Sequence, residues 1–591
     1  MASVQSERGR PVHALEYEIA FTSFAPLNTD LFIAAADGSQ PRPLVPHPGL
    51  DYDASFSSDA RWVVFTSTRA GSADIYRVQV DGSRLEHLTN DPAFDAQGAL
   101  SPDGSQLAFV SSRSGQADIW LLTLATGTLR NLTHSPAGDF RPSWSPDGRW
   151  IAFSSDRDSK RPRFAFSTLH STEIYVMRAD GSAVRRVTQQ DAVAGSPAWS
   201  ADGKQLVYYE AEIAELQKIR SPLRTRGTTQ IVSLDLASNE RKVLTSGPGE
   251  KWSPRWLSDG RLAYASGGPE GGVELGSGGP GARGQVQGPS WSADGRWLVF
   301  HRELEDRWPP LRAWPSRDSS FQLLRSGIFP SFSPSGDRLV VNDERAAIVR
   351  NSILLMNSDG TQRSILFSNP EQSAVGPAWS PLGDRIALSV GRFFAAVQGP
   401  VTADLAVINA DGSGLEILTD GSGNSGFPSW SQDGRRLVYR AGSKEKSGLL
   451  ILDLASRTSS VLTSGPSHDS LPAWSPQGDR IAFMSDRDGD YEIYSIALDG
   501  SDLKRLTSSP GNDAHPAWSP DGKWLSFISA RGGFKDESAL HPHNPQPYGD
   551  LYVMRANGSD VRILTDDQFD DGTPTWRPSP RRTSPGARSK R

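Results

Sequence analysis

Cysteine is absent from the 591-residue chain. The sequence therefore excludes disulfides, thiolate metal sites and a cysteine nucleophile. It also lacks the Gly-x-Ser-x-Gly elbow of serine hydrolases, the His-Glu-x-x-His pair of zinc peptidases and the Gly-x-x-x-x-Gly-Lys loop that binds phosphate. These absences remove the commonest sequence signals of a hydrolase or a nucleotide-binding enzyme.

Long apolar runs and a charge excess are missing as well. No stretch approaches the length of a membrane-spanning helix, and no apolar core marks an export signal near residue 1. The 62 Lys and Arg residues nearly balance the 68 Asp and Glu residues, for a net charge of -6. We therefore expect neither a membrane span nor a nucleic-acid partner. The compartment stays open: cytoplasmic for the sequence as it stands, periplasmic or secreted if a signal was removed.

What the chain does contain is a repeated phrase. "SWSPDGRWIAFSSDR" (Ser143–Arg157) recurs with variations from "SFSSDARWVVFTSTR" to "AWSPDGKWLSFISAR". Repeats of 20 to 50 residues are typical of solenoids, propellers and arrays. Twelve copies align on one apolar, mostly aromatic position: Phe56, Leu100, Trp144, Trp199, Trp256, Trp291, Phe332, Trp379, Trp430, Trp474, Trp518 and Trp576.

Each repeat predicts four short antiparallel strands, which we call a to d. The clearest copy, Pro472–Thr507, has four apolar runs with two-residue alternation, separated by Pro-Gln-Gly, Asp-Gly-Asp and Asp-Gly-Ser turns. A four-stranded unit of roughly 40 residues does not bury both its faces alone, so units must stack, and radial stacking gives a β-propeller. We expect the Trp of strand a to pack between blades.

The phrases "WSPDG", "IAFSSDR", "EIYVM" and "ADGS…LT" resemble the WD-type blades of the TolB-like β-propeller family. The resemblance extends from about Tyr17 to Trp576. It implies an all-β propeller, for which the twelve anchors predict about twelve four-stranded blades. It does not imply one function, because such blades occur in binding proteins, in lyases and in the gating domains of peptidases.

The two ends of the repeat region complement each other. Tyr17–Val45 reads as strands b, c and d without an a, and Gly572–Pro580 as an a without the rest. Pairing them removes exposed strand edges, so we expect the N- and C-terminal strands to share a closing blade. Two six-bladed propellers are the simplest arrangement, and one twelve-bladed ring is the alternative. The predicted units are a tail (1–16), strands completing the last blade (17–51), a first propeller (52–325), a second propeller (326–580) and a basic disordered tail (581–591).

Insertions indicate which face of the propeller carries function. The a–b and c–d turns are short, whereas the b–c connections are long, and these emerge with the d–a connections on one face, which we call the loop face. Loops on a rigid scaffold are where binding and catalysis concentrate. The long b–c segments are Asp156–Thr172, Tyr209–Thr228, His301–Ser320, Gly391–Ala403 and Ala530–Gly549.

Two of these segments combine arginine with aromatic side chains. "HRELEDRWPPLRAWPSRD" contains Arg302, Arg312 and Trp314, and "GRFFAAVQGP" contains Arg392 and Phe393. Guanidinium groups and aromatic platforms suit a planar or sugar-like ligand that bears carboxylate or sulfate. The alternative is that these residues cover a blade and form surface ion pairs.

The last b–c segment, "RGGFKDESALHPHNPQPYGD", gathers further polar residues. We expect Lys535, Asp536 and Gln546 to bind ligand. The pair His541 and His543 predicts a manganese, zinc or calcium site, with His515 from the preceding d–a loop as a third ligand. This set resembles that of oligogalacturonate lyases, whose propeller holds a metal. The alternative is a proline-rich surface loop without metal.

A row of carboxylates precedes several a strands. They are Asp53, Asp95, Asp139, Glu250, Asp469, Asp513 and Asp571. Such a row predicts either an acidic channel mouth that attracts cations or a basic peptide, or side chains that bond the local turns.

Two functions follow from these patterns. The first is a TolB-like propeller that binds a protein or saccharide ligand on the loop face. The alternative is a metal-assisted lyase or hydrolase acting on an acidic saccharide, with His301, Arg302 and Tyr548 as the candidate catalytic residues.

Overall fold

The computed structural model describes residues 17–23, 29–159, 171–190, 192–215, 228–267, 271–276, 280–283, 286–303, 312–313, 321–324, 328–343, 352–391, 402–421, 423–443, 446–537, 549–569 and 571–580. Within these residues the strands form twelve four-stranded sheets. The all-β fold class predicted from the sequence is confirmed. Among the same residues there is no helix of the length and apolarity that a membrane crossing needs.

Six sheets make up what we call the first lobe. Their strands are β4 (Asp51–Phe56), β5 (Trp62–Ser67), β6 (Asp74–Gln79), β7 (Glu86–His87); β8 (Asp95–Leu100), β9 (Gln106–Ser111), β10 (Asp118–Thr123), β11 (Thr128–Asn131); β12 (Asp139–Trp144), β13 (Trp150–Ser155), β14 (Glu173–Arg178), β15 (Arg185–Arg186); β16 (Val193–Trp199), β17 (Gln205–Ala211), β18 (Gln230–Asp235), β19 (Arg241–Val243); β20 (Lys251–Trp256), β21 (Leu262–Ser266), β22 (Gly272–Leu275), β23 (Pro280–Arg283); β24 (Gln287–Trp291), β25 (Trp297–Glu303), β2 (Thr29–Ala35) and β3 (Arg42–Pro43).

The other six sheets make up the second lobe. Their strands are β28 (Ile328–Phe332), β29 (Arg338–Asn342), β30 (Ile353–Asn357), β31 (Ser364–Phe367); β32 (Ser373–Trp379), β33 (Arg385–Gly391), β34 (Ala403–Asn409), β35 (Glu416–Ile417); β36 (Gly426–Trp430), β37 (Arg436–Gly442), β38 (Ser447–Asp453), β39 (Thr458–Val461); β40 (Asp469–Trp474), β41 (Arg480–Ser485), β42 (Glu492–Ala497), β43 (Lys504–Arg505); β44 (Asp513–Trp518), β45 (Trp524–Ser529), β46 (Asp550–Arg555), β47 (Arg562–Ile563); β48 (Asp571–Pro580), β1 (Tyr17–Ser23), β27 (Phe321–Leu324) and β26 (Arg312–Ala313).

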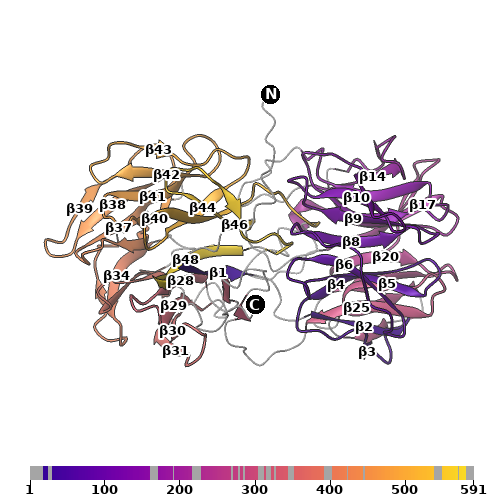
Figure 1. The fold of residues 1–591 in the computed structure, drawn as a ribbon, viewed down its shortest axis with the longest axis horizontal. Helices are drawn as coiled ribbons and strands as arrows, with labels where there is room; N and C mark the ends of the chain where they lie inside the picture. Colours follow the sequence, from indigo (N-terminus) through magenta and orange to yellow (C-terminus); the bar gives the residue numbers. More distant parts are fainter. Residues whose placement is uncertain are drawn as a thin grey trace, which may run out of the picture.

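The first strands of the sheets pack against one another in two closed cycles. In the first lobe the order is β4, β8, β12, β16, β20, β24 and back to β4; in the second it is β28, β32, β36, β40, β44, β48 and back to β28. We call these cycles the first ring and the second ring. Figure 1 shows the two lobes side by side, the first in indigo to magenta and the second mostly in rose, orange and yellow, with the indigo β1 beside β48. The arrangement is propeller-like, as expected.

The N-terminal strands are divided between the lobes. β1 pairs antiparallel with β48, and its Ile19 and Phe21 are fully buried with Trp576, which confirms the predicted pairing of the chain ends (Figure 1). β2 instead pairs with β25, where Leu31 and Ile33 join the first-lobe core. The prediction that all of Tyr17–Val45 completes one blade is therefore wrong for β2 and β3, because each lobe has a sheet that lacks strands.

The sheet that contains β48 also takes strands from an unexpected place. β27 pairs parallel with β1, and β26 pairs with β27. These two strands fall within the unit 52–325 that the sequence assigned to the first propeller, yet they lie in the second lobe. The chain thus crosses between lobes twice, once between β1 and β2 and once between β25 and β26.

The repeated phrase has the architectural role expected of it. In the copy that begins at Ser143, the hydroxyl of Ser145 donates to Asp147, and Gly148 has a φ of +69°, which closes the turn between β12 and β13. The Trp144 indole donates to the carbonyl of Ala99 in the neighbouring sheet at 3.0 Å. The same bond to a neighbouring sheet recurs at Trp199, Trp430, Trp518 and Trp576. The Trp291 indole instead donates to the carbonyl of Ala36, which follows β2 of its own sheet.

Candidate functional site

Every first strand carries one residue with a positive φ, placed where its pairing with the second strand shifts register. Such a bulge re-aims the side chain of the extra residue. In the first ring these residues are Asp53, Gln97, Arg141, Ser196, Ser253 and Gly288; in the second ring they are Phe329, Gly376, Phe427, Leu471, His515 and Thr573. We call them the bulge residues.

Bulge residues of sheets that are not neighbours touch each other. Arg141 on β12 donates to Asp53 on β4 at 2.9 Å, although β8 lies between these strands. In the second ring, Phe329 on β28 and Phe427 on β36 have ring centroids 5.2 Å apart, with β32 between them. Contacts across an intervening sheet place these side chains at the centre of each ring.

The centre of the first ring is polar and is filled by a loop of the second lobe. This loop, Arg531–Glu537, follows β45. Arg141 donates to both carboxylate oxygens of its Asp536, through Nε at 2.9 Å and through Nη2. The Arg141 side chain is 19% exposed, whereas those of Asp53 and Asp536 are 3% and 1% exposed. One arginine of the first lobe therefore joins a carboxylate of each lobe.

Glu537 reaches further into the first ring and is fully buried. Its carboxylate accepts hydrogen bonds from Ser154 Oγ at 2.6 Å, from Tyr209 Oη at 3.0 Å, and from the Ser196 amide and hydroxyl at 2.5 and 2.9 Å. Burial, together with the neighbouring Asp536, raises the pKa of Glu537. Four donors nevertheless satisfy this carboxylate, as a buried charge requires.

Lys535, in the same loop, turns back to its own lobe. Its Nζ lies 2.7 and 2.8 Å from the two carboxylate oxygens of Asp550 and 2.6 Å from Asp566 Oδ1. Burial alone would lower the pKa of Lys535, but Asp550 and Asp566 outweigh it and raise the pKa. The ammonium group therefore stays charged and ties the loop to β46 and to the segment before β48.

Further contacts surround this centre, and all of them join the loop faces of the two lobes. Gln97 donates to the Lys535 carbonyl at 3.1 Å, and Gln116 donates to the Arg531 carbonyl at 2.9 Å. Asp566 accepts from Ser112 Oγ at 2.8 Å. Apolar contacts add to these polar ones: Phe534 packs with Phe94 and Phe140, and Phe569 lies against Tyr52.

The centre of the second ring is apolar by contrast. Phe329 contacts both Phe427 and His515, the latter at 5.6 Å between ring centroids. Phe329, Phe427 and Leu471 are only partly buried, whereas His515 is buried. This ring therefore has aromatic and aliphatic side chains at its axis. The corresponding positions of the first ring hold charged side chains.

Burial lowers the pKa of His515 to about 3, so the imidazole is neutral near pH 7. Because the unfolded chain binds a proton near pH 6.5, the second lobe should lose stability as the pH falls from about 6.5 towards 3. We expect His515→Leu to reduce this acid sensitivity, and Leu471 shows that leucine tolerates the same backbone conformation. Urea unfolding between pH 4 and 8 measures the effect. Equal pH dependence in both proteins would contradict it.

Four of the carboxylates in the row before the a strands, Asp95, Asp139, Asp469 and Asp513, bond the local turns, which is one of the two interpretations predicted from the sequence. Asp95 pairs with Arg113, Asp139 with Arg157, and Asp513 with Arg531, which connect strand a to the b–c turn of the same sheet. The same pairing recurs in Asp51–Arg69 and Asp469–Arg487. Asp53 is different, because it occupies a bulge position.

The structure does not gather all the predicted site residues that it describes into one cluster. His301 and Arg302 lie on β25, where His301 faces Tyr52 and Arg302 stacks on Phe32. His515 lies at the centre of the second ring, and Arg312 lies on β26. Lys535 and Asp536 contact other parts of this chain. The remaining predicted residues lie outside the described part of the chain: Trp314, Arg392, Phe393, His541, His543, Gln546 and Tyr548.

Sequence analysis named Asp53 and His515 for other reasons, but it missed the remaining bulge residues and Glu537. Aligning the twelve repeats on their anchors exposes one variable position shortly before each anchor, and Arg141 and Phe427 stand at this position. No local signal indicates that these residues meet across a ring, because their sheets are not adjacent.

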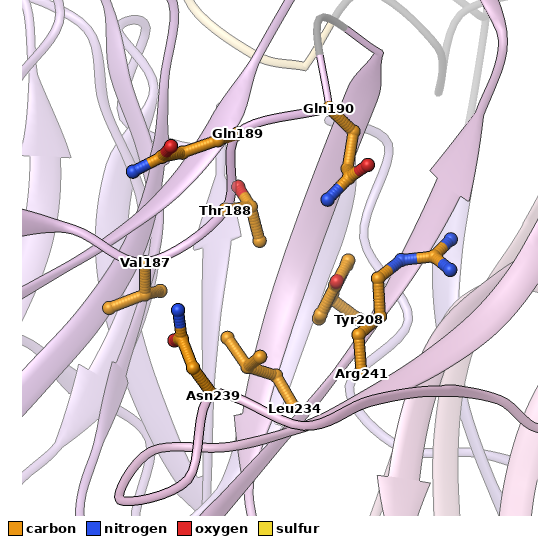
Figure 2. A pocket seen from close by; sticks show the side chains of 8 residues that line it. All are labelled: Val187, Thr188, Gln189, Gln190, Tyr208, Leu234, Asn239 and Arg241. Atoms are coloured by element: carbon orange, nitrogen blue, oxygen red, sulfur yellow. The ribbon is translucent and has the colours of Figure 1, made fainter.

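Apart from the ring centres, a ligand could be held in a pocket or at a metal site. A hollow of about 170 Å³ lies at the outer edge of the first lobe, between the segment after β15 and strands β17 to β19 (Figure 2). Its Arg241 is paired with Glu210. The described residues contain no group of three or more His, Cys, Asp or Glu side chains arranged to hold a metal ion.

The comparison with protein families agrees with the propeller-like fold. The TolB beta propeller domain family (PD40) matches residues 86–220 and 393–536, one segment in each lobe. Similar solved structures include a putative TolB from Agrobacterium tumefaciens, at 22% identity over 42% of this chain and 83% of that chain, with a TM-score of 0.34.

Two further structures cover more of the chain at lower identity. TolB from Acinetobacter baumannii is 14% identical over 82% of each chain, with a TM-score of 0.24. An oligogalacturonate lyase in complex with manganese is 14% identical over 82% of this chain and 98% of that chain, also with a TM-score of 0.24. These likenesses are too low to bear on function. The comparison with curated protein sequences finds no match.

Proposed function

We propose that this chain, whose repeats belong to the TolB β-propeller domain family, is a binding protein built from two six-bladed propellers. The two closed cycles of first strands support two rings rather than one ring of twelve blades. On this proposal the first propeller spans residues 29–303, and the second is formed by 17–23 with 312–580. These limits replace a boundary at 325 because β26 and β27 pair within the second lobe.

The ligand site that we propose is the centre of the second ring, on the loop face. The supporting observation is that Phe329, Phe427 and Leu471 remain partly exposed at the ring axis. Partly exposed aromatic side chains held by a rigid sheet are typical of binding hot spots. The first ring offers no comparable surface, because Asp536 and Glu537 fill its centre. The ligand is a protein or saccharide segment that places an apolar or ring-shaped group over Phe427.

Peptide selection on the immobilised full chain tests this proposal. We expect aromatic peptides to be enriched, and we expect Phe427→Ala to weaken their binding about tenfold or more, which corresponds to about 1.4 kcal/mol. Fluorescence anisotropy measures the affinities. Ile365→Ala is the control, because Ile365 on β31 is 67% exposed. Equal binding to wild type and Phe427→Ala would contradict the proposed site.

Metal analysis of the purified protein separates binding from catalysis. Stoichiometric manganese, zinc or calcium that is lost in His541→Ala/His543→Ala, with turnover of uronic-acid oligosaccharides, would replace the binding function with a metal-assisted lyase or hydrolase. Neither metal nor turnover, together with loss of peptide binding in Phe427→Ala, would support the binding protein.

A further inference from the structure

We propose that the Arg531–Glu537 loop acts as an intramolecular ligand: it occupies the centre of the first ring and thereby locks the two lobes together. An acidic segment from outside then reaches this centre only by displacing the loop.

The centre of the first ring has the properties of a receptor for two adjacent carboxylates. The donors to Glu537 come from β13, β16 and β17, and Arg141 of β12 holds Asp536. These strands belong to two neighbouring sheets, so the receptor exists only when the two sheets pack together. Preorganised donors in a water-poor site bind carboxylates more strongly than exposed groups do.

Gly195 of the first lobe supports the proposal that the ring centre is a receptor for Glu537. A Cβ atom at this position would lie 2.5 Å from the Glu537 carboxylate and 2.5 Å from the Tyr209 hydroxyl. Its φ is not among the positive ones, so its backbone conformation does not require glycine. The absent side chain instead leaves the space that Glu537 enters.

The connections between the lobes make such a lock effective. The chain crosses between them only on either side of β2–β25, and the remaining described contacts lie around the loop, at Gln97, Gln116, Ser112 and Tyr52. A tethered loop has an effective concentration of about millimolar at its receptor. A free acidic peptide must exceed this value to compete, so binding at Arg141 and separation of the lobes are coupled.

The first experiment measures lobe separation. Because the chain has no cysteine, Ser83→Cys and Ser501→Cys place one fluorophore on an exposed turn of each lobe. We expect Gly195→Ala and the double variant Asp536→Asn/Glu537→Gln to change the energy-transfer efficiency, because both release the loop. Gly423→Ala is the matched glycine control, since a Cβ there meets nothing within 4 Å. Unchanged efficiency in both loop-releasing variants would overturn the proposal.

The second experiment measures the receptor. The probe is the peptide Arg-Gly-Gly-Phe-Lys-Asp-Glu, which copies residues 531–537. We expect it to bind Asp536→Asn/Glu537→Gln at least tenfold more tightly than wild type, and to lose this binding when Arg141→Ala or Gly195→Ala is added. Circular dichroism confirms that each variant is folded. Equal binding to wild type and the double variant, or equal binding of a peptide ending in Asn-Gln, would overturn the proposal.

Discussion

Deletion of Tyr17–Val45 is expected to unfold both lobes. The deletion removes β1 from the second lobe and β2 with β3 from the first. It takes away fully or almost fully buried side chains in both cores, among them Phe21 and Leu31. Large-to-small changes at such positions cost about 2–5 kcal/mol each, and a whole domain is stable by only about 5–15 kcal/mol. Circular dichroism and thermal unfolding measure the result, and wild-type-like melting would contradict it.

Single substitutions separate the destabilisation of the second lobe from that of the first. We expect Phe21→Ala to destabilise the second lobe by about 3–5 kcal/mol and Leu31→Ala to destabilise the first lobe by about 2–5 kcal/mol. Hydrogen exchange, read peptide by peptide, assigns the loss of protection to a lobe. Leu503→Ala is the control, because Leu503 is 44% exposed. Faster exchange in the first lobe alone after Phe21→Ala would contradict the observed division of the N-terminal strands.

Lys535→Met is expected to destabilise the second lobe by about 3–5 kcal/mol, because it leaves the buried carboxylates of Asp550 and Asp566 without their cation. Lys504→Met is the matched control: it breaks the exposed pair with Asp502, and such pairs contribute about 0–1 kcal/mol. Urea unfolding at pH 7 measures both. A loss no larger in Lys535→Met than in Lys504→Met would contradict the prediction.

The loss in Lys535→Met should depend on pH. Burial raises the pKa of Asp550 to about 6 even with the lysine present. The folded state therefore binds this proton more tightly than the unfolded state, and acidification favours the folded state through Asp550. We expect the destabilisation to shrink as the pH falls from 7 to about 5. A loss that grows over this range would show that Asp550 is not the responsible group.

Local patterns in the sequence determined the sheets. The Ser145–Asp147–Gly148 turn and the Trp144 anchor act within one blade or between adjacent blades, so their spacing repeats and can be read. The number of four-stranded units and the all-β class follow from this repetition. The same reasoning predicted long loops on one face, and in the described part of the loop after β45, Asp536 and Glu537 contact the other lobe.

The destination of each N-terminal strand was decided by the tertiary structure. β1 and β2 both carry an apolar strand pattern, and either pattern suits the edge that β48 or β25 presents. Backbone hydrogen bonds do not distinguish partners, so the choice rests on side-chain packing in two separate cores. The parallel pairing of β27 with β1 likewise has no local sequence signal.

The role of the charged loop was also decided by the tertiary structure. The sequence showed that Lys535 and Asp536 lie together in a long loop, and it predicted that they bind a ligand. Their partners Asp550 and Arg141 stand in different parts of the chain, and Arg141 belongs to the other lobe. The sequence does not show which oppositely charged residue a given Lys or Asp pairs with, because ion pairing depends on which groups are buried together in the fold. Closing two rings and docking their loop faces brought these groups out of water as one network.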